Sequence, residues 1–165
     1  MTDHPFNDAM VRGLFLAQAT ATMGLDPAWD RAVADYVARD LRSRAHEEFG
    51  PFVHRRNEQI VESSDLQRKH GEAWKDTTEG KPMWERHWEI SKADDNAMRE
   101  QFYEPLWESH RRLVKTPAPS LAAAVLKASI IELYEVWNDC TLLGDCIAII
   151  DDDLARLVPL EGGAA

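Results

Sequence analysis

The sequence predicts an all-α protein, a helical bundle with a long central antiparallel helical hairpin. Three observations support this fold class. Glycine and proline gather at a few points, the apolar residues between these points recur with the 3.6-residue period of a helix, and no stretch alternates with the period of two that a strand requires. The breakpoints lie at 24–27, 50–51, 80–82, 116–119 and 162–163.

Two helices are expected before residue 53. The first runs from about Phe6 to Met23 and ends at Gly24, a residue that is common just after a helix. The second begins with Asp26 as its cap and proline at its first position. Its apolar stripe predicts a buried face, formed by Trp29, Val33, Tyr36, Val37 and Leu41. Gly50-Pro51 should break or sharply kink this helix.

The middle of the chain, residues 54–115, is expected to form an extended helical hairpin with its tip near 77–82. Its first arm is mainly polar, because only Ile60, Val61, Leu66 and Trp74 are large and apolar. Its second arm is richer in aromatic residues. Pro105 should kink the second arm because proline removes a backbone donor.

The last third should contribute two further core helices within 116–158. Thr116 or Ser120 caps the first of them, and residues 121–128 are apolar on nearly all sides, which predicts deep burial. Each of the two helices has an apolar stripe. The first stripe contains Leu126, Ile130, Leu133 and Trp137. The second is a heptad pattern of Leu143, Ile147, Ile150, Leu154 and Leu157. Residues 1–165 are thus expected to form one helical domain with core helices at 1–53 and 116–158 and a flexible tail at 159–165.

The charge is acidic and uneven. The chain has 29 acidic and 19 basic residues, a net charge of −10, and its last 50 residues are the most acidic part. Clustered Lys and Arg are needed to contact phosphate backbones, so direct nucleic-acid binding is not expected. No signal peptide or apolar run long enough to cross a membrane is present, and the two cysteines, Cys140 and Cys146, are too far apart for a C-x-x-C site. These features predict a cytoplasmic protein with reduced thiols and no membrane association.

The stretch from Leu113 to Ala123, followed by Lys127, and the later segment Asp153-Leu154-Ala155-Arg156-Leu157 carry a family resemblance. They resemble small helical proteins of alphaproteobacteria, often encoded near prophages, that have a TPA-x-[ST]-L-A-G turn and a D-L-x-R-L end. The resemblance covers about residues 100–158, and Ala123 stands where the pattern prefers glycine. It implies a helical hairpin and a bacterial or phage source, and it assigns no catalytic residue.

Motifs for metal binding and catalysis are missing from the sequence. It has no Glu-x-x-His pair, no His-Glu-x-x-His, no Gly-x-Ser-x-Gly and no glycine-rich phosphate loop. We therefore expect no metal, cofactor or catalytic residue. The alternative is a metal-dependent or hydrolytic enzyme in which His54, His110 and nearby carboxylates meet between helices.

Acidic residues of the last third have two interpretations. Glu132, Glu135 and Asp139 follow helical spacing, and they either face a basic partner or form the solvated back of a buried helix. Asp151, Asp152 and Asp153 cannot all face one way on a helix, and all three are expected to be exposed because aspartate is rarely buried.

Aromatic residues of the second arm give the strongest functional signal, since the polar first arm is too poor in apolar residues to cover them. Trp84 and Trp88 lie near the expected tip, and Phe102, Tyr103 and Trp107 follow. Exposed aromatic patches often mark protein-binding sites. We therefore predict a non-enzymatic protein that self-associates or binds another protein through Trp84, Trp88 and Trp107. A specific version is a phage-encoded accessory or inhibitor protein whose acidic face, including Glu132, Glu135 and Asp139, binds a basic partner.

Overall fold

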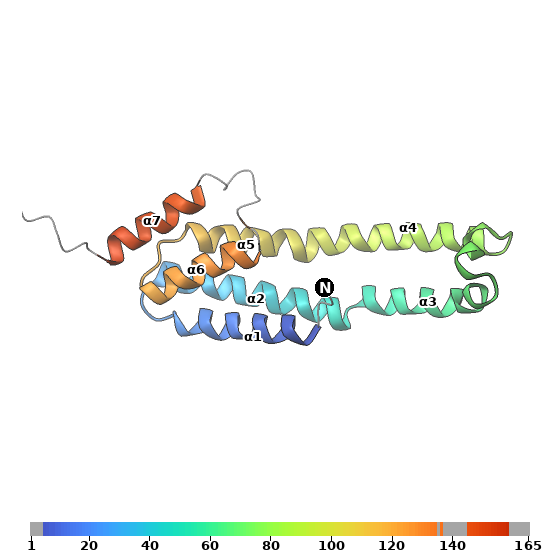
Figure 1. The fold of residues 1–165 in the computed structure, drawn as a ribbon, viewed down its shortest axis with the longest axis horizontal. Helices are drawn as coiled ribbons and strands as arrows, with labels where there is room; N and C mark the ends of the chain where they lie inside the picture. The colour runs from blue at the N-terminus through green and yellow to red at the C-terminus, as the bar shows by residue number, and fades with distance from the viewer. Residues whose placement is uncertain (1–4, 135, 137–144, 159–165) are drawn as a thin grey trace, which may run out of the picture. The chain divides into compact units, whose positions relative to one another are not determined.

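The computed structural model describes residues 5–134, 136 and 145–158, and it confirms the all-α class (Figure 1). The described residues contain helices and turns but no strand. The helices are α1 (Pro5–Ala21), α2 (Pro27–Phe49), α3 (Pro51–His70), α4 (Gly80–Met98), α5 (Glu104–Lys115), α6 (Leu121–Leu133) and α7 (Asp145–Leu157). A 3₁₀ helix, η1 (Gly71–Asp76), follows α3, and a π-helix, η2 (Arg99–Tyr103), follows α4. None of the described helices is both long enough and apolar enough to span a bilayer.

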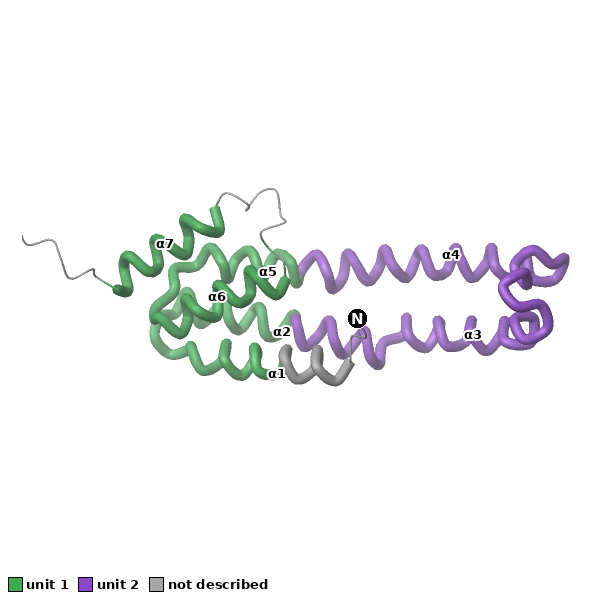
Figure 2. Tube along the Cα trace, in the orientation of Figure 1, with its two compact units in different colours: residues 1–39, 106–165 green, residues 40–105 purple. Residues whose placement is uncertain are grey.

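The chain divides into two compact units, coloured in Figure 2. Unit 1 contains residues 1–39 and 106–165, and unit 2 contains residues 40–105. The boundaries therefore fall inside α2 and at the start of α5, both of which continue as helices through them.

Unit 1 contains an apolar core formed by α1, α2, α5, α6 and α7. Trp29, Val33 and Tyr36 of α2 are fully buried, as the stripe predicted, but Leu41 at its end is 52% exposed, so the burial predicted for Leu41 was wrong. They share this core with Leu113 and Val114 of α5 and with Leu126 and Ile130 of α6, among others. The entry to α2 also follows the prediction, because the Asp26 carboxylate accepts hydrogen bonds from the backbone amides of Ala28 and Trp29, both at 2.8 Å.

The beginning of α6 is less buried than its composition predicted. Ser120 is its cap, with Oγ accepting a hydrogen bond from the Ala123 amide at 3.2 Å. Ala123, Ala124, Leu126 and Lys127 are buried, but Leu121 and Val125 are about half exposed. The expectation of burial on all sides was wrong, because α6 packs through one face and its apolar residues do not all lie on that face.

Helix α7 also faces the core with a different side from the one its heptad predicted. Ile147 and Leu154 are exposed, whereas Cys146 and Asp153, seven residues apart, are buried. The expected exposure of Asp153 was therefore wrong. Its burial has a specific cause, since Lys127 of α6 forms an ion pair with its carboxylate. Cys140, Trp137 and Leu143 lie outside the described residues.

Unit 2 is built mainly from α3 and α4, which contact each other and are joined through η1 (Figure 2). The chain reverses between Gly71 and Gly80, a few residues before the predicted tip. Gly71 ends α3 with a φ of 59°, a conformation that favours glycine. The break at Gly50-Pro51 is confirmed, because α2 ends at Phe49 and α3 begins at Pro51. The irregularity predicted at Pro105 lies about one turn earlier, in η2.

Candidate functional site

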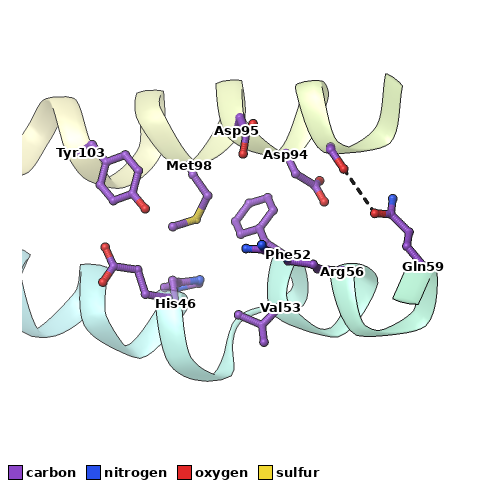
Figure 3. A pocket seen from close by; sticks show the side chains of 11 residues that line it. His46, Phe52, Val53, Arg56, Gln59, Asp94, Asp95, Met98 and Tyr103 are labelled. Atoms are coloured by element: carbon purple, nitrogen blue, oxygen red, sulfur yellow. Dashed lines mark hydrogen bonds between the residues drawn. The ribbon is translucent and has the colours of Figure 1, made fainter. Parts of the chain in front are cut away.

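A groove follows one side of unit 2, and a separate hollow of about 690 Å³ lies near the turn at Gly71 and Trp74. The larger part of the groove, about 490 Å³, is shown in Figure 3, and a smaller part of about 190 Å³ continues it toward the tryptophans. Arg56, Gln59 and Ser91 line both parts, so the two hollows adjoin each other. One wall comes from α2 and α3, and the other comes from α4 and η2.

Two irregular segments form the walls of the larger hollow. Gly50 is extended (φ −74°, ψ 166°) between α2 and α3, and a Cβ at this position would overlap the carbonyl oxygen of His46. On the other wall, η2 inserts the wider turn of a π-helix, a feature found often at functional sites. The sequence predicted the first irregularity through Gly50-Pro51 and signalled the second only through Pro105, which follows η2.

The end of the groove near Gly50 contains a group of stacked rings. The rings of His46 and Phe102 stack with centroids 4.1 Å apart, and Phe52 meets Phe102 edge-on at 6.4 Å. Arg42 and Arg55 place their guanidinium groups over Phe102 and Phe52, at 5.4 and 5.0 Å from the ring centroids. These contacts join the two walls, because Phe102 belongs to η2, and Met98 and Tyr103 lie on the same wall as Phe102, opposite His46 (Figure 3).

Two carboxylates, Glu47 and Asp95, act on the hydroxyl of Tyr103. Burial raises the pKa of Tyr103 above its ordinary value of 10, and the negative charges of Glu47 and Asp95 raise it further. Asp94, on the same helix as Asp95, forms a two-armed ion pair with Arg55, with Nε–Oδ2 at 2.9 Å and Nη2–Oδ1 at 2.5 Å. Arg55 therefore neutralises Asp94, and the negative charge that faces Tyr103 comes from Glu47 and Asp95.

The other end of the groove is aromatic and apolar. Trp74, in η1, is buried and meets Trp84 edge-on with centroids 6.1 Å apart. Trp84 and Trp88 are also 6.1 Å apart, and Lys75 lies 4.2 Å above the Trp84 ring. Trp74 thus covers one side of Trp84, while Trp88 remains 56% exposed and Ile60 54% exposed on the same hollow. We refer to Ile60, Trp84 and Trp88 as the tryptophan end.

Polar contacts hold the two arms together between these ends. His87 of α4 is buried and its Nε2 lies 2.7 Å from Oε2 of Glu62 on α3, which also pairs with Arg86. The hydrogen bonds from His87 and Arg86 lower the pKa of Glu62. Ser91 donates a hydrogen bond of 3.2 Å to Oε1 of Gln59, drawn in Figure 3. These contacts make the groove a fixed feature of the hairpin.

The six interaction residues predicted from the sequence are distributed as follows. Trp84 and Trp88 meet in the groove of unit 2. Trp107 belongs to unit 1, is 37% exposed, and contacts His110 edge-on at 5.8 Å. Glu132 is exposed on α6 of unit 1, and Glu135 and Asp139 lie outside the described residues. Sequence reasoning missed the other groove residues, in particular His46, Glu47 and Phe52, although Gly50-Pro51 marked their position in the chain.

Histidines and carboxylates of the described residues form no cluster of three or more that could hold a metal ion. His54 is exposed on α3. His110 is buried within unit 1 among the rings of Tyr36, Trp107 and Tyr134, with centroid distances of 5.3, 5.8 and 4.2 Å. Neither of its ring nitrogens has a hydrogen-bond partner within the described part of the chain, and burial lowers its pKa from 6.5 to about 4. His110 is therefore neutral near pH 7 and behaves as an aromatic core residue.

Lys127 and Asp153 form a buried network in unit 1. Asp153 pairs with Lys127 and Arg156 and accepts a hydrogen bond of 2.9 Å from the Ala118 amide, while Arg156 also donates to the Ala118 carbonyl. Burial opposes ionisation of Asp153, but these hydrogen bonds together lower its pKa. Burial is also the main cause that lowers the pKa of Lys127. Every polar group of Asp153 is used in holding α7 against α6 and the turn before it, which indicates a structural role.

Comparisons with known proteins add no functional assignment. Scans of protein-family models, of curated proteins and of solved structures each found no match to this chain.

Proposed function

We propose that the chain is a non-enzymatic protein-binding protein that receives its partner in the groove of unit 2. The observation that carries this proposal is the exposure of Trp88 beside Ile60 in a pre-formed hollow. Tryptophan is enriched among the residues that dominate protein–protein binding energies, and such residues lie in pockets that a partner can dehydrate. Trp74 already fills the inner side of the cluster, so covering Trp88 requires further apolar surface.

The groove suits a macromolecular partner better than a small substrate. It is open and elongated along two helices, whereas small-molecule sites are usually concave and enclose most of their ligand. The proposal includes both a second copy of the chain and a different protein as partner, and it places the protein in the cytoplasm. The acidic residues of the last third, with Glu132 exposed on α6, fit the more specific proposal of an accessory or inhibitor protein that covers a basic surface.

The test compares Trp88→Ala with the matched control Val61→Ala. Val61 is 72% exposed on α3, next to Ile60 in sequence, but it does not line the groove. Each variant is measured by light scattering and by quantitative affinity capture from the cells that produce the chain. We expect a partner, or a dimer, that is retained by the wild type and by Val61→Ala and is reduced at least tenfold by Trp88→Ala. Equal retention by all three proteins would refute the proposal.

A further inference from the structure

The walls of the groove restrict the shape of what can lie in it. Both walls are helices, whose backbone hydrogen bonds are made within the helix, so they offer no free edge to pair with an extended peptide. An extended segment in the groove would leave its own amides and carbonyls unpaired, whereas a helix brings its hydrogen bonds with it. Helix α3 has 20 residues and is about 30 Å long, which is enough to contact several turns of a partner helix.

The two ends of the groove differ in chemistry. The tryptophan end exposes apolar surface from Ile60 and Trp88. At the other end, Glu47 and Asp95 both act electrostatically on Tyr103, and Asp94 is already paired with Arg55. The carboxylates Glu47 and Asp95 line the larger hollow together with one arginine, Arg56, while Asp94 is neutralised by Arg55. Acidic groups therefore outnumber basic ones there, and the larger hollow is the acidic end of the groove.

We propose that the occupant of the groove is an amphipathic helix of another protein, with apolar side chains on Ile60, Trp84 and Trp88 and a Lys or Arg near Glu47, Asp95 and Tyr103. This inference rests on the proposed function and names the chemistry of the partner. A second copy of the chain is disfavoured because each copy has a net charge of −10, so two copies repel each other. A basic helix is attracted to the acidic chain and is complementary to both ends of the groove.

The experiment uses the full chain and three synthetic helical peptides of about 18 residues, a length of about 27 Å. All three carry the same leucine stripe, and one end carries lysines in the first peptide, glutamines in the second and glutamates in the third. Affinities are measured by isothermal titration at two salt concentrations. The chain is tested as wild type, as Trp88→Ala, as Glu47→Gln/Asp95→Asn, and as the control Glu85→Gln/Glu89→Gln, which removes two exposed charges of α4 that line neither hollow.

We expect the lysine peptide to bind at least about tenfold more tightly than the glutamate peptide at low salt. This preference should disappear in Glu47→Gln/Asp95→Asn, persist in Glu85→Gln/Glu89→Gln, and weaken at high salt. Trp88→Ala should weaken binding of all three peptides.

Other outcomes separate this inference from the proposed function. If the three peptides bind equally and Trp88→Ala weakens them all, the basic partner is wrong but the tryptophan groove stands. If no peptide binds while capture of a partner still depends on Trp88, the partner is not a helix of this kind. If wild type is a dimer that Trp88→Ala dissociates, the occupant is a second copy and the inference is wrong. If Trp88→Ala binds the peptides as wild type does, and partner capture is also unchanged, both proposals fail.

Discussion

Unit 1 and unit 2 are both helical, but they bury different kinds of side chain. In unit 1, Trp29, Tyr36 and Leu113 are completely enclosed in a continuous apolar core. In unit 2, the buried apolar side chains are Trp74, Met98 and Phe102 among the described residues, and polar contacts such as Glu62–His87 contribute much of the packing. Unit 1 thus encloses several large apolar side chains completely, whereas unit 2 leaves Ile60 and Trp88 more than half exposed.

The largest effect should come from removing Lys127. Lys127→Met leaves the buried carboxylate of Asp153 without its ammonium partner, and breaking a buried pair in this way costs about 3–5 kcal/mol. Chemical denaturation should show this loss, and hydrogen exchange should locate it in α6 and α7. The control Lys92→Met removes an exposed lysine of α4 and should change stability by less than about 0.5 kcal/mol. If the two variants have equal free energies of unfolding, the buried carboxylate of Asp153 does not need Lys127 as its partner.

Acid should destabilise unit 1 through His110. The pKa of His110 is about 4 in the folded protein against 6.5 ordinarily, so the unfolded chain binds the proton at higher pH. Above pH 6.5, His110 is neutral in both the folded and the unfolded chain, and the free energy of unfolding does not depend on it. As the pH falls from 6.5 to 4, the unfolded chain binds the proton first, and the free energy of unfolding decreases by about 3 kcal/mol in total. Denaturation at pH 7.5, 5.5 and 4.5 measures this loss.

His110→Phe is the matched variant, because it keeps an aromatic ring and removes the titrating group. Carboxylates also contribute to acid unfolding, so the quantity to compare is the difference between wild type and variant. We expect the wild type to lose more stability than His110→Phe between pH 6.5 and 4. Parallel curves would show that His110 is protonated at no cost to the fold.

The turn of unit 2 should be sensitive to Gly80→Ala. A methyl group at Gly80 would overlap the Trp74 carbonyl oxygen and lie 2.8 Å from Oγ1 of Thr77, which accepts the Gly80 amide hydrogen bond. We expect a loss of about 1–3 kcal/mol, seen as faster hydrogen exchange in η1 and the start of α4. Gly13→Ala in α1 is the control, since its Cβ meets no atom within 4 Å and should stabilise the helix by up to about 1 kcal/mol. If Gly80→Ala has slower hydrogen exchange in η1 than the wild type, the methyl group does not clash with the Trp74 carbonyl oxygen.

The smallest effect on stability should come from Trp88→Ala. Because Trp88 is more than half exposed, its removal should lower the free energy of unfolding by less than about 1 kcal/mol. The same change at the enclosed Trp29 should cost about 3–5 kcal/mol. Thermal denaturation of the two variants measures this contrast, and a cost of several kcal/mol at Trp88 would make it a core residue and remove the basis of the binding proposal.

The sequence predicted the features of the fold that depend on local patterns. Helical periodicity, the Asp26 cap and the break at Gly50-Pro51 are all properties of neighbouring residues, and the structure confirms them. It did not predict the side of α7 that is buried. The apolar heptad was the stronger local signal, but Asp153 is fixed by Lys127, 26 residues away in the sequence, and such a contact has no periodic signature.

The candidate site was predicted at one end only. Trp84 and Trp88 could be identified because tryptophan is costly to expose and the opposite arm is polar. The acidic end depends on His46, Glu47 and Asp95 approaching from different helices, and on the π-helix opposite Gly50. Each of these residues resembles an ordinary solvated side chain when only its neighbours in the sequence are considered.

The division of the chain has a consequence for its synthesis. Residues 40–105 form unit 2 as one continuous stretch, whereas unit 1 joins residues 1–39 to residues that follow 105. On the ribosome, the hairpin therefore emerges whole and can close early, while Trp29 and Tyr36 must wait for Leu113, Leu126 and the rest of their core. The groove of unit 2 can thus form in the nascent chain before the apolar core of unit 1 is complete.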